Sequence, residues 1–160
     1  MTKKEINKAL FEGCKEGDFN KVRLAINFGA EVRAKDNNGW TPLHYASYYN
    51  HIEIAKLLIE RGTDVNAKGN GGGRTPLHVA STYNSIKIVE LLIERGADVE
   101  AKDNDGWTPL YYASSWNRIA MAELLIDAGA DVNVKDDRGY TPLYVAQSYE
   151  MQDLLKKYMK

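Results

Sequence analysis

The sequence predicts an all-α protein made of stacked repeats, and three observations carry that prediction. The tripeptide Thr-Pro-Leu occurs four times, starting at Thr41, Thr75, Thr108 and Thr141, with spacings of 34, 33 and 33 residues. Each copy opens a segment with helical spacing of apolar residues, and a second such segment follows it. Clusters of Asp, Asn and Gly separate successive units. A fixed period of this length is typical of a stack in which each unit packs mainly on its neighbours.

The first unit, residues 2–33, lacks Thr-Pro-Leu but keeps the register of the others. Leu10 lies 33 residues before Leu43, and the segment 29–32 aligns with 62–65. Its first helix is rich in Lys and Glu. A terminal repeat has one face in water, so we interpret this unit as an N-terminal cap.

The next unit shows the plan of a full repeat. Thr41 is a good helix N-cap, and Pro42 follows at the first helical position, where a missing N–H costs nothing. We expect this helix to end near Asn50, because Asn tolerates the left-handed conformation. A second helix is predicted over about 52–60, with Gly62 closing it, and residues 64–68 lead as an extended arm into a turn.

The plan recurs along the chain. The second helix reappears over 86–94 and 119–127, each closed by a glycine. The turns 36–39, 103–106 and 136–139 are rich in Asp, Asn and Gly, so we expect hairpin-like finger loops and not strands of a sheet. The finger 69–74 has one extra residue and a glycine in place of the aspartate. We expect it to be the most mobile finger, since glycine loses most entropy on ordering.

The last unit is shorter at the turn between its helices. Ala46 and Leu57 are 11 residues apart, whereas Ala146 and Leu154 are 8 apart. We therefore predict one domain over 1–160 with five units. These are an N-terminal cap (2–35), three full repeats (36–68, 69–102 and 103–135) and a C-terminal cap (136–160).

These units resemble ankyrin repeats. The resemblance rests on Thr-Pro-Leu-His with Tyr-Ala-Ser after it, on the helix that ends Leu-Leu-Ile-Glu-Arg-Gly, and on Gly-Ala-Asp-Val at 96–99 and 129–132. It implies a solenoid of helix–turn–helix units with finger loops, whose first helices and fingers line a concave face. Tyr111 and Tyr144 stand where the family has histidine, so an unbroken histidine ladder is not expected.

Composition narrows the functional class. The chain has 21 basic and 22 acidic residues and a net charge of −1, which offers no electrostatic footprint for nucleic acid or an anionic membrane. One cysteine, Cys14, cannot form an internal disulfide. There is no apolar signal-peptide core and no run long enough to span a bilayer. We expect a cytoplasmic monomer that binds no nucleic acid and no membrane.

Catalytic and cofactor motifs find no support. His44 and His78 occupy equivalent framework positions, and His51 lies in a turn, so none has partners at metal-ligand spacing. The glycine run 69–73 ends in Arg74 and lacks both a dinucleotide fingerprint and a Gly-Lys-Ser/Thr phosphate loop. We predict that the chain is not an enzyme and carries no cofactor or metal.

The strongest functional signal is aromatic. The resemblance places three columns of residues on the concave face: the residue after each finger glycine, and the last two residues of each first helix. Trp, Tyr and Arg, the types that dominate interface hot spots, fill much of these columns. The predicted partner-binding residues are Trp40, Tyr48, Tyr49, Arg74, Tyr83, Trp107, Trp116, Tyr140 and Tyr149.

The sequence therefore predicts a protein–protein interaction module that binds through its concave face. Three alternatives stay open. The chain could be an engineered or selected binder or a repeat-folding model protein. The aromatic columns could serve only to pack one repeat on the next. A small molecule or a peptide could stack on the rings in the groove.

Overall fold

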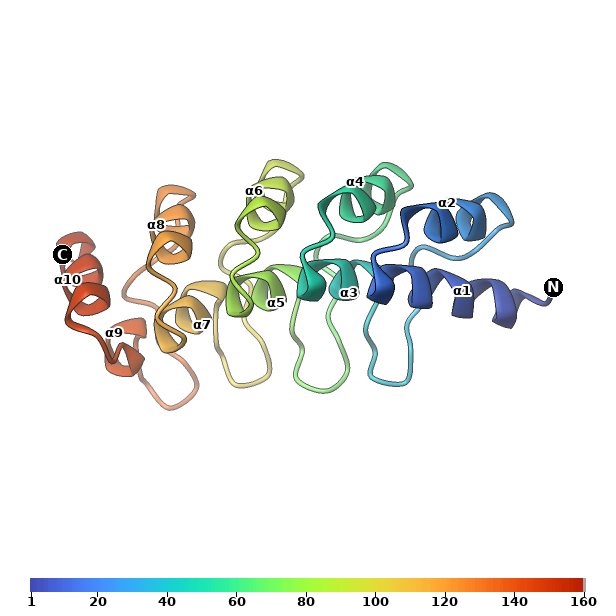
Figure 1. Cartoon of the computed structure of the whole chain (residues 1–160). Coiled ribbons are helices and arrows are strands. Elements are labelled where there is room, and N and C mark those ends of the chain that lie inside the picture. Colours follow the sequence, from blue (N-terminus) through green and yellow to red (C-terminus); the bar gives the residue numbers. More distant parts are fainter. Residues whose placement is uncertain (160) are drawn as a thin grey trace.

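The computed structural model describes residues 1–159, which form ten helices in five stacked pairs and contain no strand (Figure 1). The second helices lie along one side of the row, the first helices lie in the middle, and four finger loops extend on the opposite side. The first helices are α1 (Lys3–Glu16), α3 (Pro42–Tyr49), α5 (Pro76–Thr82), α7 (Pro109–Ser115) and α9 (Pro142–Val145). The second helices are α2 (Phe19–Asn27), α4 (Ile52–Glu60), α6 (Ile86–Glu94), α8 (Ile119–Asp127) and α10 (Tyr149–Tyr158).

The predicted helix boundaries are confirmed in the full repeats. Helices α4, α6 and α8 span the residues that the apolar spacing indicates. Each of α3, α5, α7 and α9 has a threonine at the N-cap and a proline at its start. Asn50 ends α3 with a φ of 60°, and the equivalent Asn84 and Asn117 have φ values of 61° and 55°. This left-handed residue turns the chain into the second helix of each pair.

The core is continuous along the row. Leu10, Leu43, Leu77 and Leu110 are each almost fully buried, one per first helix, which confirms the register of the N-terminal unit. Apolar residues of the second helices pack against this column and join the same cluster. Since each pair buries its apolar side against its neighbours, the repeats depend on stacking for their stability.

The fingers bond to one another through the main chain. Asn70 N donates to Asn38 O at 3.2 Å, and Asp137 N donates to Asp105 O at 3.1 Å. At the base of the fingers, a row of lysines repeats one interaction. Each Nζ donates to the main-chain carbonyl of the next lysine: Lys35 to Lys68 at 2.9 Å, Lys68 to Lys102 at 3.1 Å and Lys102 to Lys135 at 3.1 Å. We call this row the lysine ladder.

The C-terminal unit corrects one part of the sequence alignment. Tyr149 was expected at the end of a first helix, but α9 ends at Val145 and Tyr149 is the first residue of α10. Ser148 is the N-cap of α10, and its side chain accepts from Met151 N at 3.1 Å. The missing residues remove the last turn of the first helix, so the aromatic position at its end does not exist in this unit.

Candidate functional site

His44 and His78 are framework residues. The Nδ1 atom of His44 accepts from Thr41 N at 3.0 Å, so the neutral ring carries its proton on Nε2 and donates to Arg74 O at 2.9 Å in the next repeat. His78 makes the same two bonds with Thr75 N and Trp107 O. Burial lowers the pKa of His44 to about 4. Both rings are therefore neutral connectors between repeats, with no free nitrogen for catalysis.

The histidine link ends at the third full repeat, where Tyr111 replaces the histidine. The Tyr111 ring stacks on Trp107 with centroids 5.0 Å apart. Burial and the neighbouring Asp136 carboxylate raise the pKa of Tyr111 to about 12. Trp107 Nε1 donates to Asp136 Oδ2 at 3.2 Å. An indole and a phenol that meet a carboxylate of the next finger thus take over the connection between repeats.

Three of the four residues after the finger glycines pack on their own repeats, and Arg74 packs on the next one. Trp40 is half-buried and stacks on His44 at 5.5 Å, as Trp107 does on Tyr111. The Arg74 guanidinium lies over the Tyr112 ring, 4.8 Å from its centroid. Tyr140 is exposed and stacks on Tyr144 at 3.8 Å. In this column, three rings and one guanidinium each lie against a ring of a first helix.

The column at the ends of the first helices is the more exposed one. Tyr49, Tyr83 and Trp116 are 47%, 46% and 58% exposed, and each directly precedes the left-handed asparagine of its repeat. Tyr48 is half-buried beneath them, with its ring centroid 4.2 Å from that of Tyr83 and 4.7 Å from that of Tyr49. We call Tyr49, Tyr83 and Trp116 the exposed aromatic row. It places three large rings on three successive repeats.

The C-terminal end adds a residue that the sequence reasoning missed. Tyr144 is 64% exposed and forms a stacked pair with Tyr140, but its sequence position is that of the framework histidine. The sequence holds no signal for this exposure, because the equivalent His44, His78 and Tyr111 are buried. Tyr149 is 87% exposed but lies on α10, apart from the column in which it was predicted.

The N-terminal end contributes a second group that the aromatic columns did not include. The Phe11 ring of α1 meets the edge of Tyr45 at 6.0 Å, and Lys15 Nζ lies 4.6 Å from the centroid of the same Tyr45 ring. Tyr45 in turn contacts Trp40, with ring centroids 5.1 Å apart. Helix α1 therefore extends the aromatic surface of the first full repeat.

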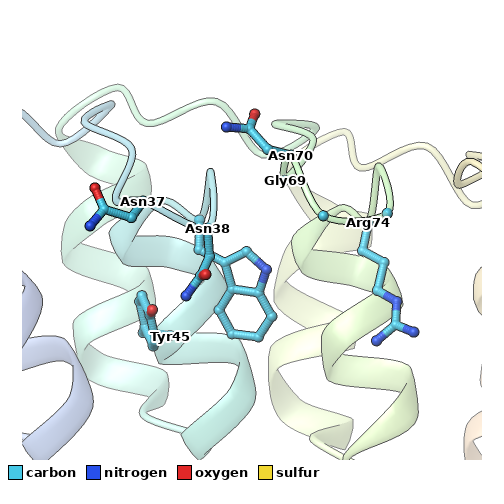
Figure 2. Close-up of a pocket in the computed structure, with 9 residues that line it drawn as sticks. Asn37, Asn38, Tyr45, Gly69, Asn70 and Arg74 are labelled. Atoms are coloured by element: carbon cyan, nitrogen blue, oxygen red, sulfur yellow. The ribbon is translucent and has the colours of Figure 1, made fainter.

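A hollow of about 630 Å³ opens between the first two fingers (Figure 2). Asn37, Asn38 and Tyr45 lie on one side of it, and finger 69–74 lies on the other. The side chain of Arg74 extends away from Asn37 and Asn38 in this view, toward Tyr112 of the next repeat. Polar amides and the main chain of glycines thus form much of its lining. We call this space the finger hollow.

We also searched residues 1–159 for a metal site, a membrane-spanning helix and a reactive thiol. They contain no group of three side chains that could hold a metal ion, and no helix in them has the length and apolar character needed to cross a bilayer. Cys14 is buried, and burial raises its pKa to about 12, so its thiol stays protonated and unreactive at neutral pH.

A family model described as ankyrin repeats (3 copies) matches residues 2–69, 68–136 and 102–159, nearly the whole chain. The chain belongs to the ankyrin-repeat family. Ankyrin repeats are generally protein–protein interaction modules, and the stacked pairs with finger loops are the ankyrin architecture that the sequence predicts.

Several ankyrin-containing relatives align with parts of the chain. Protein phosphatase 1 regulatory subunit 27 of Mus musculus is 38% identical over 64 residues, 40% of this chain and 42% of the relative. Ankyrin repeat and SOCS box protein 16 of Homo sapiens is 41% identical over 58 residues, 36% of this chain and 13% of the relative. Putative ankyrin repeat protein FPV233 of Fowlpox virus is 54% identical over 48 residues, 29% of this chain and 9% of the relative. The matches span less than half the length of each of these proteins.

Proposed function

We propose that this ankyrin chain binds a partner protein through the concave face formed by its first helices and finger loops, with the exposed aromatic row at the centre. The observation that carries the proposal is the exposure of Tyr49, Tyr83 and Trp116 on three successive repeats. Large rings give contact area for little loss of side-chain entropy, which is why Tyr and Trp dominate interface hot spots. Half-exposed aromatic rings are available for burial by a partner.

The other predicted residues take supporting places in this proposal. The half-buried Trp40, Tyr48 and Trp107 are held by stacking and edge contacts, so they would form a rigid floor under the partner. The remaining predicted residues would flank that floor. They are Arg74 beside Tyr112, Tyr140 with Tyr144, and Tyr149 on α10.

The proposed role is that of a non-catalytic, monomeric binding module in the cytoplasm. The two framework histidines, His44 and His78, use both ring nitrogens in hydrogen bonds within and between repeats. The helices α3, α5, α7 and α9 carry no charged side chain. A module of this kind would act by occupying a surface of its partner, as an inhibitor or an adaptor.

The test is a pull-down from cytosolic extract with the wild-type chain and with a Tyr49→Ala, Tyr83→Ala, Trp116→Ala variant. The matched control replaces three exposed residues of the second helices, Glu60, Lys87 and Glu123, with alanine. We expect a partner that binds wild type and the control and is lost by the aromatic variant, with all three folded by circular dichroism. Equal recovery on all three would refute the proposed face.

A further inference from the structure

The second finger lacks the carboxylate that organises the other three. Gly69 stands where the others have Asp36, Asp103 and Asp136. In each of those fingers, Oδ1 of the aspartate accepts two main-chain N–H groups of its own loop. The distances are 2.9 and 3.0 Å at Asp36, 3.0 and 2.9 Å at Asp103, and 2.9 and 2.8 Å at Asp136. In three of the four fingers, the carboxylate of an aspartate of the loop thus accepts the main-chain N–H groups of the same loop.

The same carboxylate also serves the neighbouring side chains. Oδ2 of Asp136 accepts from the indole of Trp107 in the preceding repeat at 3.2 Å. Oδ2 of Asp103 accepts from the hydroxyl of Tyr112 in its own repeat at 2.6 Å. At the second finger, both kinds of partner are affected. Val79 replaces the tyrosine, and the indole of the preceding repeat, Trp40, meets Gly69 instead of a carboxylate.

The loss leaves hydrogen-bond donors without acceptors beside an open space. The Trp40 indole nitrogen would lie only 3.2 Å from a Cβ added at Gly69, yet it has no acceptor within residues 1–159. The main-chain N–H groups of Gly71, Gly72 and Arg74 likewise have no hydrogen bond within the described part of the chain. All of these residues line the finger hollow of about 630 Å³.

Several main-chain acceptors around the finger hollow, in contrast, are already engaged. The carbonyl of Asn38 accepts from Asn70 N, that of Gly69 from Gly73 N, and that of Gly72 from Asn104 N. The carbonyl of Arg74 accepts from both Gly69 N and His44 Nε2. Asp36, the aspartate of the adjacent finger, is bonded to its own loop and to the Tyr45 hydroxyl. The asparagine side chains that line the hollow can turn their NH₂ groups toward it. Together with the free main-chain N–H groups of the second finger and the Trp40 indole, they suit a bound acceptor.

We propose that the finger hollow binds the side-chain carboxylate of an Asp or Glu residue of the partner protein, which takes the place of the aspartate missing at position 69. This deepens the proposed function and rests on it. The pair of Trp107 and Asp136 shows within the same chain how an indole of one repeat and a finger of the next hold a carboxylate between them. Charge-assisted hydrogen bonds of this kind are stronger than neutral ones and fix the register of a bound chain.

The test is an NMR titration of the full chain labelled with ¹⁵N, with the Trp40 indole signal assigned from a Trp40→Phe variant. The probe is N-acetyl-aspartate N-methylamide, whose one charge is a side-chain carboxylate. Its matched neutral control is N-acetyl-asparagine N-methylamide. We expect weak, saturable shifts of the Trp40 indole and of the Gly72 and Arg74 amides with the carboxylate alone. No saturable shift, an equal response to the amide, or a stronger response to inorganic phosphate would overturn the assignment.

A second variant ties the response to the missing aspartate. Gly69→Asp supplies an internal carboxylate and is expected to abolish the titration. Lys87→Asp is the control, since it adds a carboxylate at an exposed position of helix α6, outside the lining of the finger hollow, and its response is expected to stay. A persisting response in Gly69→Asp would contradict the proposal.

The two proposals fail separately. A partner that is lost by the aromatic variant but bound equally by wild type and Gly69→Asp would leave the concave-face function standing and overturn the carboxylate site. In the opposite case, the aspartate probe gives a saturable response that Gly69→Asp abolishes, while the aromatic variant still binds every partner that wild type binds. That result would support the carboxylate site and overturn the aromatic centre.

Discussion

At the scale of single residues, the sequence predicts where the aromatic residues of each column lie in the repeat. It does not predict which of these rings are stacked and which are exposed. Trp40 and Trp107 follow a finger glycine as expected, yet their rings lie flat on the first helix of their own repeat. Trp116 and Tyr83 project instead from the end of a helix. Which ring stacks and which stays exposed depends on side chains that the adjacent repeat brings close, and sequence spacing alone does not contain that information.

The two kinds of tryptophan give a first prediction at this scale. Trp116→Ala should change the free energy of unfolding by less than about 0.5 kcal/mol, because the side chain is mostly exposed. Trp107→Ala should cost about 2 kcal/mol, since it removes a stacked, half-buried ring and the bond to Asp136. Urea unfolding followed by circular dichroism measures both values. Similar losses in the two variants would show that Trp116 is also a framework residue.

The framework histidines give a pH prediction. Burial lowers the pKa of His44 from 6.5 to about 4 and also lowers that of His78. Between these two pKa values, the histidine binds a proton in the unfolded chain but not in the folded chain. The contribution of His44 to the free energy of unfolding is therefore complete above pH 6.5 and is lost as the pH falls toward 4. For His44 alone, the loss between pH 7 and 5 should be about 2 kcal/mol.

The measurement is urea unfolding at a series of pH values for wild type and a His44→Gln variant. The variant loses some stability at every pH, so the slope is compared and not the absolute value. A flatter pH dependence in the variant is expected. An unchanged slope would mean that carboxylates, and not this histidine, govern the acid response.

At the scale of elements, the sequence was most informative where specific residue types mark the start or the end of a helix. The N-cap threonines, the first-turn prolines and the asparagine after α3 sufficed to predict the helix boundaries in the full repeats. It was least informative at the last unit. The spacing places the deletion at the turn between the helices, but the structure shows that the end of α9 is lost and with it the aromatic position that the alignment kept. Spacing in the sequence shows that the last unit has fewer residues. Which element becomes shorter depends on how the remaining residues pack.

The second finger supports a prediction about a whole loop. Gly69→Asp combined with deletion of Gly71 should raise the free energy of unfolding by about 1 to 2 kcal/mol. The new carboxylate would accept loop N–H groups, as in the other three fingers, and the shorter loop has less entropy to lose. Thermal and urea unfolding are compared with a variant that carries the deletion alone. A double variant less stable than that control would show that the Trp40 ring cannot move aside for a side chain at position 69.

At the scale of the whole molecule, the period fixes the architecture because the helices make their main contacts within their own unit and with the adjacent units. Helix α3 packs between α1 and α5, and α7 between α5 and α9. The uncharged first helices α3, α5, α7 and α9 lie between the fingers and the charged second helices, so the charge of the chain is concentrated away from the exposed aromatic row (Figure 1). Composition alone reports a balance near zero and does not reveal this segregation.

The lysine ladder has a consequence for how such a chain can grow over evolutionary time. The ammonium group of each donor lysine in the ladder donates to the main-chain carbonyl of the equivalent lysine in the following repeat. Donor and acceptor are therefore the same type of residue. A duplicated repeat inserted between two units that the ladder joins would break one of these bonds and supply the lysine needed to form two. The same contact thus joins three of the four junctions between units, so gene duplication within this part of the row can lengthen the molecule without a new kind of interface.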